Sequence, residues 1–64
     1  MCEANAYILD KDGNQELFLE RVDTLTVDAN GLILENIFSE KKFFQGTIKE
    51  LALVNHRIIL QAQD

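Results

Sequence analysis

Three turn signals divide this chain into short segments, and they limit its fold more than any other feature. The stretches DKDGN at 10–14 and DANG at 28–31 contain Asp-Gly and Asn-Gly pairs, which favour the positive φ angles of tight hairpins. FSEKK at 38–42 is a polar interruption between apolar runs, and the chain has no proline. We therefore expect strands joined by hairpins, within a single domain that spans residues 1–64.

The segments between these turns alternate apolar and polar side chains with a period of two, which is typical of half-buried strands. Leu25 and Val27 alternate with threonines, and Leu32 and Leu34 follow the same spacing. Other short apolar runs are AYIL at 6–9, ELFLE at 16–20, FFQGTIK at 43–49 and VNHRIIL at 54–60. The sequence thus predicts an all-β fold of about six short antiparallel strands in a small barrel or sandwich, because closing the sheet removes exposed edges.

The segment that follows Phe44 allows two local interpretations. Gly46 within a strand indicates a bulge or a close approach of two backbones. TIKELALV at 47–54 could instead form a short helix with its apolar residues on one face. A strand is the expectation, and the helix is the alternative.

The small size of the chain predicts that its core needs support. A chain of 64 residues buries only about 60% of the surface that it exposes when unfolded. Small domains add disulfides, a metal or a partner subunit, and one cysteine cannot form an internal disulfide. Runs such as Leu17–Leu19 and Phe43–Phe44 place apolar side chains on both faces of a strand, which favours a homodimer that covers the outer set.

Charge and hydropathy indicate the compartment and the class of partner. Eleven acidic residues against six basic ones give a net charge of −5, and the basic residues are scattered along the chain. Nucleic-acid binders neutralise phosphates with a clustered basic face, so nucleic acid is not expected as a partner, whereas a cation is compatible with this balance. There is neither an apolar run of about 18 residues nor a signal peptide, which together with the unpaired cysteine predicts a cytoplasmic protein without membrane contact.

The sequence offers little for catalysis or for calcium binding. Cys2 and His56 could in principle act as nucleophile and base, but no third residue stands out to orient them, so we do not expect an enzyme. DKDGNQE resembles the start of a calcium loop, yet counting from Asp10 makes Gly13 fourth, where the loop requires glycine sixth. Arg21 then takes the twelfth place, where the loop requires a bidentate glutamate. A hairpin turn with solvated carboxylates is the expected structure.

The single histidine lies in VNHRIIL at 54–60. Strand alternation places His56 on the same apolar face as Ile58 and Leu60. We therefore expect a core histidine that is hydrogen-bonded to backbone, rather than a metal ligand. Burial would keep its ring neutral.

The single cysteine stands at position two, where it has unusual covalent neighbours. The Met1 amine, the Cys2 amide nitrogen when deprotonated, and the Cys2 thiolate can close two adjacent chelate rings on one metal ion. This strongly donating, nearly planar set suits Ni(II) or Cu(II) rather than the tetrahedron that zinc prefers. Glu3 could add its amide or carboxylate as a weaker ligand. The alternative is an incidental cysteine at the end of the chain.

The MC start, the hairpin-rich middle and the GTIKELALVNHRIIL tail at 46–60 together resemble the CooT family. These small nickel-binding proteins are accessory to maturation of nickel-dependent carbon monoxide dehydrogenase, and the resemblance runs from end to end. It implies an SH3-like β-barrel, a homodimer, and Ni(II) held at the N-terminus by the Cys2 thiolate. It also implies a nickel enzyme or its maturation factors as partners.

Together, the residues and the resemblance predict a cytoplasmic, dimeric nickel chaperone with Met1, Cys2 and Glu3 as its metal ligands. The barrel would serve as the scaffold for that site. Relatives also carry an RNA-binding label, which the acidic balance of this chain does not support. The alternative function is a small adaptor or RNA-binding barrel in which the cysteine is incidental.

Overall fold

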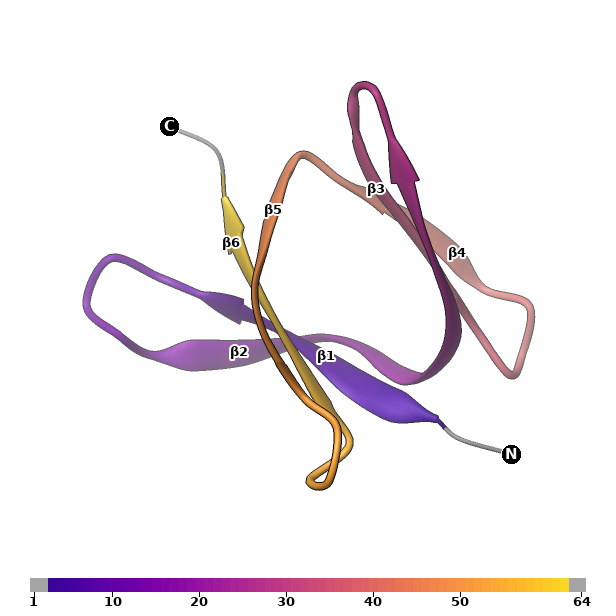
Figure 1. The fold of residues 1–64 in the computed structure, drawn as a ribbon, viewed down its shortest axis with the longest axis horizontal. Coiled ribbons are helices and arrows are strands. Elements are labelled where there is room, and N and C mark those ends of the chain that lie inside the picture. The colour runs from indigo at the N-terminus through magenta and orange to yellow at the C-terminus, as the bar shows by residue number, and fades with distance from the viewer. Residues whose placement is uncertain (1–2, 63–64) are drawn as a thin grey trace.

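The computed structural model describes residues 3–62, and these form a single six-stranded sheet (Figure 1). In chain order the strands are β1 (Ala4–Leu9), β2 (Gln15–Asp28), β3 (Gly31–Asn36), β4 (Lys41–Phe44), β5 (Gly46–Ala52) and β6 (Arg57–Ala62). Their order across the sheet is β4-β3-β2-β1-β6-β5. The predicted all-β class and number of strands are confirmed, and the alternative helix at 47–54 is wrong because this segment forms β5 and the turn after it. Residues 3–62 contain no helix that could cross a membrane.

The predicted turns are present, and side-chain oxygens hold them. Asp10 Oδ1 accepts hydrogen bonds from the backbone N–H groups of Asp12 and Asn14, at 2.9 and 2.8 Å. Asp28 Oδ1 accepts one from the Ala29 N–H at 2.8 Å, in the turn that joins β2 to β3. Asp and Asn favour turns for this reason, since a short polar side chain can accept from nearby backbone donors.

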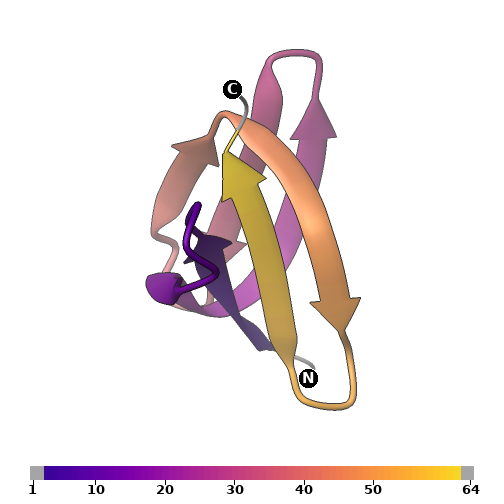
Figure 2. The same cartoon turned by 90° about the vertical axis from the view of Figure 1, so that its left-hand side faces the viewer.

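The sheet differs from the predicted closed, antiparallel barrel in two ways. β1 pairs with β6 in parallel, from Asn5 opposite Arg57 to Leu9 opposite Gln61, because the chain between them acts as a long crossover connection. β4 and β5 remain at the two edges, so the sheet curls around the core without closing (Figure 2). Only Gln45 separates these two strands, and one residue is too short for the hairpin that would pair them.

β2 pairs with both halves of the sheet because it bends near Arg21. Its first part, beginning at Gln15, pairs with β1, and its last part, ending at Asp28, pairs with β3. Arg21 has a φ of 53°, and the strand register shifts on either side of it, as in a β-bulge. The Arg21 N–H donates to Asn5 Oδ1 at 3.0 Å and its carbonyl accepts from the Ile37 N–H at 3.0 Å, so both backbone groups are satisfied at the bend.

The core is one cluster of apolar side chains contributed by every strand except β5. Its buried members are Ala6, Leu19, Val22, Leu32, Leu34, Phe44, Ile58 and Leu60. Phe44 packs edge-on against Phe18 with ring centroids 5.5 Å apart, a geometry that aromatic pairs favour. From β5, Ile48 packs against the cluster while partly buried. The alternation read in β3 holds, since Leu32 and Leu34 are buried.

The close approach expected at Gly46 is also present. Gly46 opens β5 and lies opposite Ala62 of β6. A Cβ atom at this position would lie 2.5 Å from Phe44 Cε2 and closer still to the Gln61 carbonyl oxygen. Glycine therefore allows the chain to pass from one edge of the sheet to the other without displacing its neighbours.

Candidate metal centre

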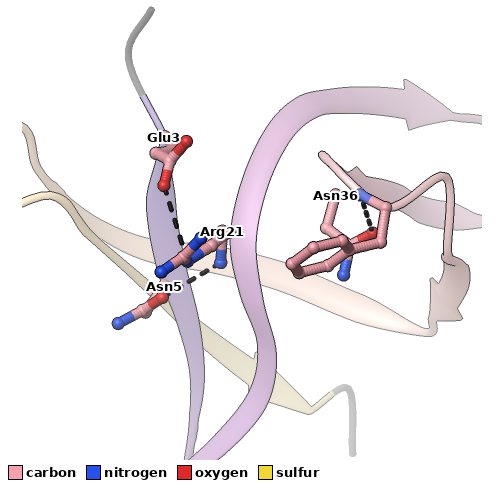
Figure 3. A network of polar contacts seen from close by, with 5 residues as sticks. Glu3, Asn5, Arg21 and Asn36 are labelled. Carbon is pink, nitrogen blue, oxygen red and sulfur yellow. Dashed lines mark hydrogen bonds and ion pairs between the residues drawn. The ribbon is translucent and has the colours of Figure 1, made fainter.

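The described part of the predicted metal site begins at Glu3, because Met1 and Cys2 lie outside the described residues. Glu3 directly precedes β1, which is held between β2 and β6. Its Oε1 lies 3.7 Å from Arg21 Nε, and the two side chains are 37% and 55% exposed (Figure 3). A long, solvated ion pair is weak, so the Glu3 carboxylate stays accessible to another ligand.

The bend of β2 places the Arg21 side chain beside the start of β1. Figure 3 shows Arg21 between Glu3, which directly precedes β1, and Asn5, which lies within β1. The backbone of the bend is attached to Asn5 by the hydrogen bond described above. The position of Glu3 relative to Arg21 is therefore set by strand pairing and by the bulge, and the sequence pattern gave no sign of it.

His56 lies in the turn between β5 and β6, so its predicted place in the core is wrong. Its side chain is exposed, and β6 begins only at Arg57. The prediction counted strand alternation through Val54, which is 91% exposed and also belongs to the turn. Side chains alternate between the two faces of a sheet only within a strand. The alternation therefore cannot be used to predict which way a side chain in a turn points.

Backbone hydrogen bonds join the His56 turn to the start of β1. The His56 N–H donates to the Leu53 carbonyl at 3.2 Å, and the His56 carbonyl accepts from the Asn5 N–H at 2.9 Å. His56 has a φ of 56°, a left-handed conformation in which Asn, Asp and His are the enriched non-glycine residues. The turn therefore holds His56 close to the N-terminal end of the sheet.

Glu3 and His56 line the same two hollows of the surface. One has a volume of about 410 Å³ and the other about 220 Å³. The structure thus brings a carboxylate and an imidazole together from opposite ends of the chain. No group of three or more His, Cys, Asp or Glu side chains suited to a metal occurs within residues 3–62. A metal ion held here would require further donors; the sequence-based prediction takes them from Met1 and Cys2, which lie outside the described residues.

Fold and site together define a class: a small, single-sheet β domain that presents a carboxylate and an imidazole beside its N-terminal end. Within that class, the chain belongs to the CooT family, because the family model described as "CO dehydrogenase accessory protein CooT" matches residues 1–61. The chain is also similar to a crystal structure of a protein assigned to CooT from Carboxydothermus hydrogenoformans. The two are 52% identical with a TM-score of 0.91, over 98% of this chain and 100% of the other. No curated protein matches this chain.

Sequence reasoning named Glu3 but missed Arg21 and His56 as its neighbours. For His56 a signal was present, because Asn55-His56 is a pair of residues that tolerate left-handed backbone and could have marked a turn. For Arg21 the sequence contains no such signal, because a bulge in the middle of a long strand cannot be predicted locally when the bulged residue is neither Gly nor Asn.

Proposed function

We propose that this protein is a cytoplasmic Ni(II)-binding accessory protein that supports nickel insertion into carbon monoxide dehydrogenase. Membership of a family described as CO dehydrogenase accessory proteins supports the maturation role. The nickel assignment rests on donor chemistry, because an amine, an amidate and a thiolate in sequence favour a square-planar Ni(II) complex. Met1 and Cys2 supply these three donors in our proposal.

The observation that carries the proposal is the placement of Glu3 and His56 at the start of β1. Cys2 directly precedes Glu3 in the chain, so its donors are one residue along the chain from this carboxylate, and His56 lines the same two hollows as Glu3. A square-planar ion needs one donor beyond the three from Met1 and Cys2. Imidazole is the better of the two neighbours for Ni(II), so we assign this position to His56, with the Glu3 carboxylate as the alternative.

A nickel titration of the Cys2→Ser variant tests this proposal. We expect it to lose nearly all nickel affinity and the thiolate-to-nickel absorbance, with unchanged circular dichroism. His56→Gln should keep the thiolate absorbance with weaker binding and a shifted ligand-field band, because one donor is exchanged for water. Wild-type affinity in Cys2→Ser would contradict the site assignment, and an unaltered spectrum in His56→Gln would contradict the fourth donor alone.

We further propose that the protein is a homodimer. Seven large apolar side chains within residues 3–62 are exposed: Leu17, Val27, Phe38, Phe43, Leu51, Leu53 and Val54. This number of exposed apolar side chains is high for a domain with so small a core. Packing them against a second copy of the chain would bury apolar surface that a single sheet leaves exposed. Phe43, on edge strand β4 and 52% exposed, offers a position at which to test this.

A further inference from the structure

Both arginines of the chain line one hollow on the surface, the one of about 410 Å³. Arg21 reaches it from the bend of β2 and Arg57 from the start of β6. The other lining residues are Glu3, Asn5, Tyr7, Asn55 and His56. Two guanidinium groups thus face a single carboxylate, which gives this hollow an excess of positive charge in a chain whose net charge is −5.

Arg57 has no acidic partner within 4.0 Å in the described chain. Its guanidinium lies 4.1 Å from the centroid of the Tyr7 ring and donates a hydrogen bond to Gln15 Oε1. Stacking on an aromatic face restricts the plane of the guanidinium while leaving other N–H donors available. Arg57 is therefore an oriented cation that no acidic side chain within residues 3–62 neutralises.

Arg21 is only partly neutralised. Its ion pair to Glu3, which is the one recorded for it among residues 3–62, is 3.7 Å long and largely solvated, so most of its N–H donors remain open. Its backbone is fixed by the hydrogen bond to Asn5, which limits how far the side chain can move from the hollow. The two arginines thus approach one space from opposite sides of β1.

From these contacts we propose that the Arg21–Arg57 hollow binds the carboxylate group of a small organic acid. A guanidinium fork matches a carboxylate with two parallel hydrogen bonds, and the side-chain amides of Asn5 and Asn55 offer further donors. Two arginines and one glutamate leave a formal charge of +1, which a single carboxylate balances and a doubly charged phosphate does not. The volume is that of a small-molecule site, and the Tyr7 ring provides an apolar wall.

Titration of the metal-free protein with sodium propionate, a monocarboxylate, tests this site by nitrogen-15 NMR, with inorganic phosphate titrated in parallel. Propionate should give saturable shifts at the Arg21 and Arg57 side-chain Nε–Hε signals. Arg21→Gln and Arg57→Gln should each weaken binding about ten-fold or more, because a charge-assisted hydrogen bond contributes at least that factor. Arg57→Lys keeps the positive charge but lacks the paired N–H donors of the guanidinium group, so this variant should bind the carboxylate more weakly than wild type.

Lys49→Gln is the matched control, because it removes the same charge from an exposed position on β5 that does not line the hollow. Its propionate affinity should equal that of wild type. An absence of saturable shifts, or equal weakening in Lys49→Gln and Arg57→Gln, would overturn the site. Phosphate binding as tight as propionate would overturn the carboxylate assignment. All titrations are made without nickel, so the result is independent of the proposed metal site.

Discussion

Asn36 is the one buried polar residue within residues 3–62. Replacing it tests how much its hydrogen bonds stabilise the turn from β3 to β4. The side chain is 2% exposed and makes three hydrogen bonds. Its Oδ1 accepts from the backbone N–H groups of Phe38 and Glu40, at 3.0 and 2.9 Å, and its Nδ2 donates to Glu40 Oε1 at 2.6 Å. Figure 3 shows the Asn36 side chain turned into this loop.

The Asn36→Ala variant would lose all three hydrogen bonds at once. Each contributes roughly 0.5–1.5 kcal/mol net, and two partly buried N–H groups would lose their acceptor, so we expect a loss of about 2–4 kcal/mol in the free energy of unfolding. A domain of this length has only about 3–10 kcal/mol in total. The loss corresponds to a fall of roughly 10–25 °C in the melting temperature.

Urea unfolding followed by circular dichroism, at one fixed protein concentration, measures this loss. Asn30→Ala is the matched control, because Asn30 is an exposed turn residue with no side-chain hydrogen bond to residues 3–62. Its change should stay within about 0.5 kcal/mol, as for ordinary surface substitutions. An Asn36→Ala protein no less stable than Asn30→Ala would show that the three Asn36 hydrogen bonds do not stabilise this turn.

Three further predictions address the sheet, the dimer and the metal. Gly46→Ala should destabilise the protein by about 1–3 kcal/mol, because the new methyl group would overlap the Gln61 carbonyl; unchanged urea unfolding would contradict the close approach. Phe43→Glu should weaken the proposed homodimer in sedimentation, and a wild-type monomer at micromolar concentration would contradict that proposal. Nickel affinity should rise with pH through neutrality, because the terminal amine and the Cys2 amide and thiol release protons on binding. Acetylating the amine should weaken binding sharply, whereas equal, pH-independent affinity would place the metal elsewhere.

The local elements of this protein follow from its sequence alone. Turn residues such as Asp10 and Asp28 lie between runs of period-two alternation, and short-range hydrogen bonding is enough to form those turns. The alternation of apolar residues also predicted which side chains of β3 are buried, because successive side chains of a strand point to opposite faces. The donor set that we propose at Met1 and Cys2 consists of neighbours along the chain, so it could be predicted without knowledge of the fold.

Which of these elements lie side by side depends on the tertiary fold. The parallel pairing of β1 with β6 joins segments about fifty residues apart, so no local pattern could contain it. That pairing, together with the hydrogen bond from Asn5 to the His56 carbonyl, is what moves His56 from an expected core position to the side of Glu3. It also brings Arg57 onto the Tyr7 ring. The alternation of apolar and polar residues in the sequence indicates which face of a strand is buried. The residues that surround a turn depend instead on how the whole sheet curls.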